Sequence, residues 1–381
     1  MSYLQKYVRQ VKPRNESYIP HVEKIQSFLT EASSTEESTK MENVIVACWN
    51  NRNQTKSKFA TVIIKDKDVK NWYKQNGGLV ISAAINRHVY VFLKENTQFN
   101  SNELNHRIIW RQIEIQKNYK NIINPIVRSV FKLRKLKSFY ECYYSGDFPS
   151  MSGSGSSSAF ATSLLYAESL LNKKKISKKK IFEDAIHIER VMMKEHGGIQ
   201  DQVRSSIGGL GLIKISKNGN ITNKPIDLSK HNMDTLQNSI EIYFYQGSRL
   251  SSRLMKHHIE NLKENQMILN EMMMLTKEAH SLLISNKPNF IKDFANLIKE
   301  SWLIKKKFHN QISSPDLDRV IKKGLDLGAY AGKIMGAGSS GFLFFIKEPG
   351  NKLNLNNYSK KLSQPIDIKF DFDGVKQVNR F

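Results

Sequence analysis

The strongest constraint on this chain is a loop of glycine and serine at residues 152–158 that runs directly into an apolar-periodic stretch. Small residues followed by apolar residues at helical spacing predict a flexible loop that opens a helix over residues 159–171. The backbone of such a loop can approach a polyphosphate closely, and a helix N-terminus carries roughly half a positive charge. The loop therefore predicts a phosphate site in a chain that handles a nucleotide. The residues expected to bind the nucleotide are Gly153, Ser154, Gly155, Ser156, Ser157 and Ser158.

Composition alone leaves a second interpretation of this loop open, because segments rich in glycine and serine are also common as flexible linkers. Two frequent phosphate-binding sequences do not match the chain. No Gly-Lys-Ser/Thr closes the loop, as a P-loop requires, and no Gly-x-Gly-x-x-Gly follows a predicted strand, as a dinucleotide fold requires. A phosphate site here must belong to a different family.

Length and apolar content bound the class of protein. The chain has 381 residues, of which 40% are hydrophobic, enough for a large core and two domains. It shows neither an uninterrupted apolar run of about 18 residues nor the apolar block of a signal peptide, so we expect a soluble, cytoplasmic protein without a membrane partner. Cys48 and Cys142 have no metal or redox spacing and are expected to be reduced and structural.

The basic charge points to anionic partners without identifying one. The net charge of +24 comes from 59 Lys+Arg against 35 Asp+Glu, with lysine runs at 173–175, 178–180 and 305–307. These runs lack interleaved aromatic residues, and no nucleic-acid reader motif is visible, so nucleic acid is an unlikely partner. A solvated basic surface is the plainer interpretation, although phosphorylated small substrates would also be attracted.

The pattern of apolar residues divides the chain into three parts: a polar N-terminal extension over 1–56, a first domain over 57–230 and a second domain over 231–381. Residues 106–114 fit either a strand or the start of a helix. Strands are predicted at 59–64, 79–82, 88–93, 210–215, 240–245 and 341–346. Helices are predicted at 159–171, 178–194, 250–264, 267–283 and 289–306.

Two carboxylates stand out in the first domain. Glu189 lies at the border of the apolar stripe of the helix predicted over 178–194, where burial would require a cation or a hydrogen-bond donor. A magnesium ion would satisfy it, whereas the alternative is that the side chain reaches solvent or an exposed lysine. Asp201 follows a diglycine turn, and its alternative role is to cap a helix over 202–207.

A second loop of small residues, 332–341, precedes a strongly apolar strand, and it fits either a second wrap around the same phosphates or a tight turn. Phosphoryl transfer needs a phosphate cradle, magnesium ligands and a carboxylate that orients the attacking hydroxyl. Two glycine loops and two carboxylates in one chain match these requirements.

The order of these pieces resembles the GHMP kinase superfamily. Residues 152–159 look like its second motif and residues 332–342 like its third. Within the superfamily the chain is most similar to bacterial kinases of D-glycero-D-manno-heptose 7-phosphate. The segments that carry this similarity are Asp147-Phe148-Pro149, Ala185-Ile186-His187-Ile188-Glu189, Gly198-Ile199-Gln200-Asp201-Gln202, Gly208-Gly209, residues 72–78 and residues 81–86.

The resemblance implies a two-domain α+β fold with the active site in the interdomain cleft, and an ATP- and Mg²⁺-dependent sugar kinase of nucleotide-sugar biosynthesis that phosphorylates the anomeric hydroxyl. It implies that Gly153 to Ser157 bind ATP phosphates, that Ser158 and Glu189 hold magnesium, and that Asp201 orients or deprotonates the sugar hydroxyl. It assigns substrate contacts to Asp68, Gly336, Ala337 and Gly338.

The chain departs from the family at its first motif. An arginine, a strand and a Gly-Gly-Gly-Thr-Asp loop are expected over 59–68, but only Asp68 is retained, and Ile64, Lys65 and Asp66 stand where the glycines would be. Bulky or charged residues change the reach of such a loop. Met151 also replaces an arginine that is usual in these relatives, which removes a bidentate anion donor. Two alternatives therefore stay open: a galactokinase- or fucokinase-like enzyme that takes an unphosphorylated sugar, and a pseudokinase that binds nucleotide. The sequence does not indicate an oligomeric state.

Overall fold

The computed structural model describes residues 44–50, 75–96, 104–147, 155–195, 198–246, 262–308, 312–335, 338 and 340–378. The chain separates into two compact units, Met1–Met41 and Glu42–Phe381, and every element described below belongs to the second unit. No helix among the described residues combines the length and the hydropathy needed to cross a membrane.

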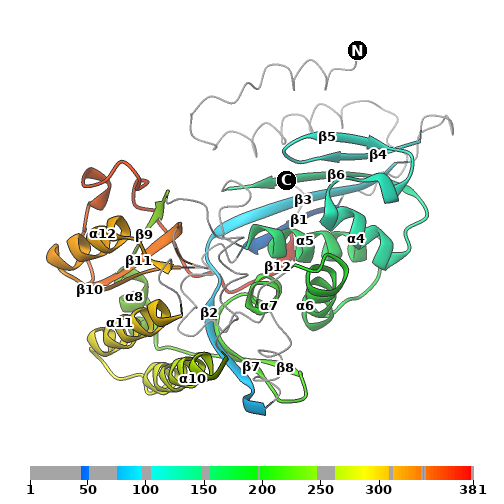
Figure 1. Cartoon of the computed structure of the whole chain (residues 1–381). Helices are drawn as coiled ribbons and strands as arrows, with labels where there is room; N and C mark the ends of the chain where they lie inside the picture. Colours follow the sequence, from blue (N-terminus) through cyan, green and yellow to red (C-terminus); the bar gives the residue numbers. More distant parts are fainter. Residues whose placement is uncertain are drawn as a thin grey trace. The chain divides into compact units, whose positions relative to one another are not determined.

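A six-stranded sheet forms one layer, with strand order β12-β1-β3-β6-β4-β5 (Figure 1). Its neighbours are antiparallel except for the parallel pair β4 and β6. Along β3 buried and partly buried residues alternate, because successive side chains of a strand point to opposite faces. The bounds are β1 Val44–Asn50, β3 Arg87–Asn96, β4 His106–Ile109, β5 Ile113–Gln116, β6 Phe139–Gly146 and β12 Val375–Gln377.

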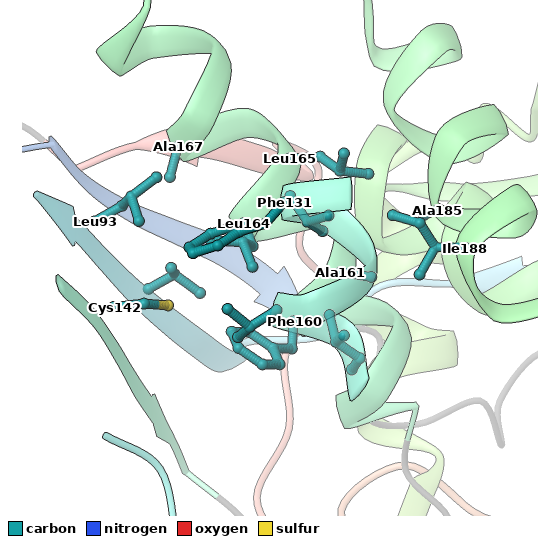
Figure 2. Close-up of a cluster of buried hydrophobic side chains, with 14 of the residues drawn as sticks. Leu93, Phe131, Cys142, Phe160, Ala161, Leu164, Leu165, Ala167, Ala185 and Ile188 are labelled. Atoms are coloured by element: carbon teal, nitrogen blue, oxygen red, sulfur yellow. The ribbon is translucent and has the colours of Figure 1, made fainter. Parts of the chain in front are cut away.

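Helices pack on this sheet, and α5 is the central one. It contacts β1 and β3 and is buried along most of its length, as is typical of a helix surrounded by other elements. Figure 2 shows the resulting core, in which Phe160 and Leu164 of α5 lie with Leu93 of β3 and Cys142 of β6. The helices are η2 Tyr119–Asn121, α4 Pro125–Arg134, α5 Ser156–Leu171, α6 Lys178–Ile186, the π-helix His187–Met192 and α7 Gln200–Ile207.

Two three-stranded antiparallel sheets complete the fold, with strand orders β2-β7-β8 and β10-β11-β9. One apolar cluster contains residues of both sheets, among them Ile81 of β2 and Phe344 of β11. The strands are β2 Gly78–Ala83, β7 Leu210–Ile215, β8 Ile221–Pro225, β9 Ile240–Tyr245, β10 Ala329–Ile334 and β11 Gly341–Lys347. The helices are α8 Lys230–Asn238, α10 Leu262–Ile284, α11 Ile291–Lys307, α12 Pro315–Asp326 and η5 Leu355–Asn357.

The C-terminal segment returns to the large sheet. The Asp371 N–H donates to the Ala84 carbonyl at 3.0 Å, and the Gly209 N–H donates to the Asp371 carbonyl at 2.6 Å. The backbones of Gly208 and Gly374 meet so closely that a Cβ on Gly208 would lie 2.3 Å from the Gly374 nitrogen. Glycine is required there for packing, and β12 follows directly to pair with β1.

The structure agrees with most of the predicted elements that it describes. The predicted α+β class is confirmed, as are the helix over 159–171 and the strands at 210–215, 240–245 and 341–346. Residues 106–114 contain the hairpin of β4 and β5 rather than a helix start. The helix predicted over 178–194 is confirmed up to Met192, but it changes type on the way, because α6 ends at Ile186 and the chain continues as a π-helix.

Other predictions fall on residues that the structure does not describe. The strand at 59–64 lies outside the described residues, as does most of the helix at 250–264. The strand β1 lies within the stretch 1–56 that the sequence assigned to a polar extension. Its apolar run is short and stands between polar stretches, which is why the sequence pattern did not reveal it.

Candidate functional site

The N-terminus of α5 contains the described part of the predicted phosphate loop. Its N-cap residue, Gly155, has φ 76°, a left-handed conformation that favours glycine, and no described side chain caps the helix. The first turn contains Ser156, Ser157 and Ser158, whose N–H groups have no acceptor within the helix. Gly153 and Ser154, which were also predicted to bind the nucleotide, lie outside the described residues. The described half of the predicted loop therefore presents backbone donors at a helix N-terminus.

Glu189 lies directly against this helix turn. Its side chain is 1% exposed, so it does not reach solvent. The Ser157 hydroxyl donates to Glu189 Oε1 at 2.8 Å, and the Ser158 hydroxyl donates to Glu189 Oε2 at 2.8 Å. The structure thus brings together the two residues, Ser158 and Glu189, that were predicted to share a metal ion.

The backbone around Glu189 is a π-helix, with the Met193 N–H bonded to the Ile188 carbonyl at 2.9 Å, five residues back. Single π-helical turns inside helices are rare and frequently mark functional sites. Sequence periodicity did not reveal this turn, since a single widened turn barely changes the apolar pattern.

The helix α7 contributes Asp201 and Gln202. Asp201 does not cap the helix, because α7 begins at Gln200 and its N-cap residue is Ile199. Asp201 is 8% exposed and Gln202 is fully buried at 0%. The Gln202 amide Nε2 donates to Glu189 Oε2, and the Gln202 Oε1 atom is buried with no hydrogen-bond partner among the described residues. Gln202 was not predicted as a site residue, although it follows Asp201 directly in the sequence.

Two charged groups flank Glu189. An Arg190 guanidinium nitrogen lies 3.6 Å from Glu189 Oε2 and also donates to the Gly198 carbonyl at 2.7 Å. Partial desolvation raises the pKa of Glu195, whose side chain is exposed at the surface, the negative charge of Glu189 raises it further, and Arg190 opposes both effects. The site therefore holds one buried carboxylate that accepts several hydrogen bonds, with a second carboxyl nearby whose pKa is raised.

These residues fit a magnesium ion. Glu189, the hydroxyls of Ser157 and Ser158, and the Gln202 Oε1 atom supply hard oxygen donors, which Mg²⁺ prefers. Among the described residues no group of three or more His, Cys, Asp or Glu side chains gathers as a metal cage. One carboxylate with neutral oxygens suits an ion that is bound largely through nucleotide phosphates and water.

A buried arginine holds α7 in place. Arg204 is 1% exposed, its Nε donates to Ser82 Oγ at 2.9 Å, and its terminal nitrogens donate to the Gly208 carbonyl at 2.6 Å and to Asn223 Oδ1 at 2.8 Å. Burial lowers the pKa of Arg204 to about 9. These bonds tie the helix that carries Asp201 to β2 and β8, a link that no sequence pattern predicted.

The remaining predicted residues come from other parts of the chain. Asp68, Gly336 and Ala337 lie outside the described residues. Gly338 has φ 106°, and a Cβ there would lie 2.6 Å from the Ile312 carbonyl oxygen, so the turn between β10 and β11 requires glycine at this position.

Comparison with known protein families finds two matches. Residues 121–209 match the model of the GHMP kinases N terminal domain, and residues 280–357 match that of the GHMP kinases C terminal domain. The first match covers α5, the π-helix and α7, which are the elements that carry the site, together with α4 and α6.

Individual proteins are similar over most of the chain. A protein of Campylobacter jejuni named D-glycero-alpha-D-manno-heptose 7-phosphate kinase is 28% identical over 323 residues, which cover 81% of this chain and 93% of that protein.

Among solved structures, a D-glycero-D-manno-heptose 1-phosphate kinase from Bacteriodes thetaiotaomicron is 19% identical with a TM-score of 0.66, covering 89% of this chain and 99% of that one. A Lactococcus lactis galactokinase complexed with galactose is 13% identical with a TM-score of 0.65, covering 93% and 99%. At these identities the two structures show the fold.

Proposed function

Because the chain belongs to the GHMP kinases and carries both of their domains, we propose that it phosphorylates the anomeric hydroxyl of D-glycero-D-manno-heptose 7-phosphate with ATP and Mg²⁺. The family matches and the similarity to the Campylobacter heptose kinase show a sugar kinase of the phosphotransferase class.

The observation that carries the proposal is the convergence of three helical segments on the Glu189 carboxylate. Hydroxyl groups from α5 and an amide from α7 meet this side chain on the π-helix. A phosphate cradle, a magnesium ligand set and a carboxylate for the acceptor are what phosphoryl transfer requires.

Each group has a distinct task in this reaction. The N–H groups in the first turn of α5 would bind phosphate oxygens, and Ser158 and Glu189 would hold Mg²⁺. The ion, when bound, neutralises charge on the transferred phosphoryl group. Asp201, in the first turn of α7, would orient the sugar hydroxyl or accept its proton.

The choice of acceptor rests on the relatives and on charge. The Campylobacter protein and the Bacteriodes structure are both named as kinases of heptose phosphates. The net charge of +24 favours a substrate that already carries a phosphate.

An unphosphorylated sugar is the second candidate. The galactokinase structure, which was solved with galactose, shares the fold at a TM-score of 0.65. The altered residues at 59–67, where the family has an arginine and a glycine loop, favour a changed acceptor or a nucleotide-binding pseudokinase.

Turnover of ATP against a panel of heptose 7-phosphate, galactose, fucose and mannose tests the proposal. We expect turnover with heptose 7-phosphate that is lost in Asp201→Asn and retained in Asp234→Asn, a matched control at an exposed position of α8. Turnover with a free hexose alone would support the second candidate. Nucleotide binding without turnover of any sugar would support the pseudokinase.

A further inference from the structure

Arg190 stands next to the Glu189 carboxylate, and the proposed reaction gives it no task. Its guanidinium nitrogen Nη2 lies 3.6 Å from Glu189 Oε2 and donates to the Gly198 carbonyl at 2.7 Å. The other terminal nitrogen, Nη1, donates to the Glu195 carbonyl at 3.4 Å. One side chain therefore contacts the carboxylate on the π-helix and two main-chain carbonyls that lie between the π-helix and α7 in the sequence.

The backbone is closed at the same place. The Glu195 N–H donates to the Glu189 carbonyl at 2.8 Å, and the Glu195 carbonyl accepts from Arg190. The first bond comes from the main chain of the π-helix and the second from a side chain of the same helix. Together they fix the main chain of Glu195 against the π-helix.

The contact with Gly198 lies just before α7. Gly198 is buried, and α7 begins two residues later at Gln200, with Asp201 in its first turn. Arg190 therefore joins the segment that carries Glu189 to the start of the helix that carries Asp201. Both carboxylates belong to the proposed reaction, and their relative position depends on this junction.

A second contact links the same two elements, since the Gln202 amide donates to the Glu189 carboxylate. The two links act on different parts of α7. Gln202 bonds through its side chain from within the helix, whereas Arg190 bonds the main chain ahead of it. Loss of Arg190 alone is therefore expected to loosen the start of α7 without detaching the helix.

The contacts suit an arginine better than any other cation. A guanidinium is planar and presents its N–H donors in a fixed fork, so it can bond two carbonyl oxygens and face a carboxylate at once, whereas an ammonium is a compact point charge. The Arg190 side chain is 19% exposed, and its Nε atom is buried with no hydrogen-bond partner among the described residues. The contacts of the two terminal nitrogens offset the cost of that unbonded donor.

We propose that Arg190 is a positioning residue of the phosphoryl transfer, which fixes the start of α7, and with it Asp201, relative to Glu189. The inference rests on the proposed function, because it takes Glu189 as a magnesium ligand and Asp201 as the carboxylate at the acceptor hydroxyl. A role limited to charge is the alternative, since a cation beside a buried carboxylate compensates its charge before a metal binds. The two roles differ in their response to Arg190→Lys.

Steady-state kinetics with ATP and heptose 7-phosphate at saturating Mg²⁺ separate the two roles. Arg190→Lys keeps the positive charge but loses the fork, and Arg190→Met loses both. We expect kcat to fall about tenfold in both variants, the effect of losing one hydrogen bond that orients a reacting group. KM for ATP should stay within about twofold, because the first turn of α5 is unchanged.

Arg128→Lys and Arg128→Met are the matched controls. The Arg128 guanidinium of α4 also donates to a main-chain carbonyl, that of Ile122, but it lies outside the site. Both control variants should keep the wild-type kcat. Circular dichroism establishes that each variant is folded, and Arg190→Gln replaces Arg190→Met if that variant does not fold.

Hydrogen–deuterium exchange gives a second readout that requires no turnover. Peptides that cover α7 should exchange about tenfold faster in Arg190→Lys than in the wild-type chain, because local opening of the helix start becomes easier. Peptides that cover α8 should exchange at the wild-type rate in the same variant. The Arg128 variants should leave α7 unchanged.

Two kinetic results would overturn the inference. A wild-type kcat in folded Arg190→Lys with a low kcat in Arg190→Met would leave only the charge role, and a wild-type kcat in both would leave no role in the reaction. Failure of the proposed function looks different, because the wild-type chain would then turn over no sugar. In that case faster exchange of α7 in Arg190→Lys would still support the positioning contact, and unchanged exchange would overturn it.

Discussion

Replacing Gln202 with glutamate tests the candidate site at its most buried contact. Gln202 is 0% exposed and Glu189 is 1% exposed, and the Gln202 amide donates to the Glu189 carboxylate. The substitution nearly preserves shape but exchanges an N–H donor for a second carboxyl group. Two carboxylates in contact cannot both ionise without a cation between them. We therefore expect Gln202→Glu to destabilise the protein when no metal is bound.

The magnitude follows from the contacts of Glu189. Its carboxylate accepts from the Ser157, Ser158 and Gln202 side chains, and the substitution removes one of these donors. A hydrogen bond to a charged group contributes about 1.5–3 kcal/mol, and holding one carboxyl protonated at neutral pH adds a further cost. The expected loss at pH 7 is therefore at least about 1.5–3 kcal/mol in the free energy of unfolding.

Urea unfolding followed by circular dichroism, with and without Mg²⁺, is the assay. Gln202→Leu is the matched control, because it loses the same donor without adding a charge. Magnesium should restore stability to Gln202→Glu more than to wild type, and should not restore Gln202→Leu. The loss in Gln202→Glu should also shrink as pH falls, since protonation of one carboxyl relieves the repulsion.

Two results would refute this reasoning. If Gln202→Glu unfolds at the wild-type urea concentration in the absence of metal, Glu189 and Gln202 are not in buried contact. If its stability is low but insensitive to Mg²⁺, the oxygen atoms gathered there do not hold a cation.

Three further predictions follow from buried polar groups. Ser158→Ala should lower kcat by at least tenfold through loss of a magnesium ligand, whereas Ser163→Ala, which loses a bond to a carbonyl of the same helix at 2.8 Å, should leave it unchanged in a steady-state assay. Burial raises the pKa of Asp371 to about 6. Its contribution to the free energy of unfolding is therefore fully present below pH ~4, where the side chain is protonated, and is lost as the pH rises through ~6. Asp371→Asn should then be more stable than wild type at pH 7.5 by about 1–3 kcal/mol in urea melts. Arg204→Met should cost about 3–5 kcal/mol by the same measurement, because it leaves buried acceptors without their donor; a loss below 1 kcal/mol would contradict its role as the anchor of α7.

Local patterns were sufficient to predict the helix that carries the proposed phosphate site. The helix α5 was predicted because small residues precede a strongly apolar periodic run. The pairing of Ser158 with Glu189, 31 residues apart, came only from the family resemblance, because nothing in the spacing of a serine and a glutamate specifies that they touch.

Other features depend on packing between distant segments and left no periodic signal. The strand β6 carries no alternating pattern, since three consecutive residues, Tyr140, Glu141 and Cys142, are buried. Lys305 of α11 is buried, although it is indistinguishable from its neighbours in sequence, and its burial follows from the side of the helix on which it falls. Arg204 has its partners on β2, β8 and the Gly208 turn, which only the fold brings together.

The altered first motif and the described site bear on different halves of the reaction. In the proposed function, the phosphate and metal half would depend on the first turn of α5, on Glu189 and on Gln202, whose side chains are in contact. The acceptor half would depend on Asp68 and on the positions around it in the sequence, where glycines are replaced. Because bulky residues change the reach of a loop that the family resemblance places at the sugar, the acceptor is the component that this chain is expected to have changed. If nucleotide binding requires Glu189 but the chain turns over an unexpected sugar or no sugar, the functional change lies in the first motif. If the wild-type chain binds no nucleotide, the functional change lies instead at the first turn of α5. That outcome would contradict the role inferred from the contacts described there.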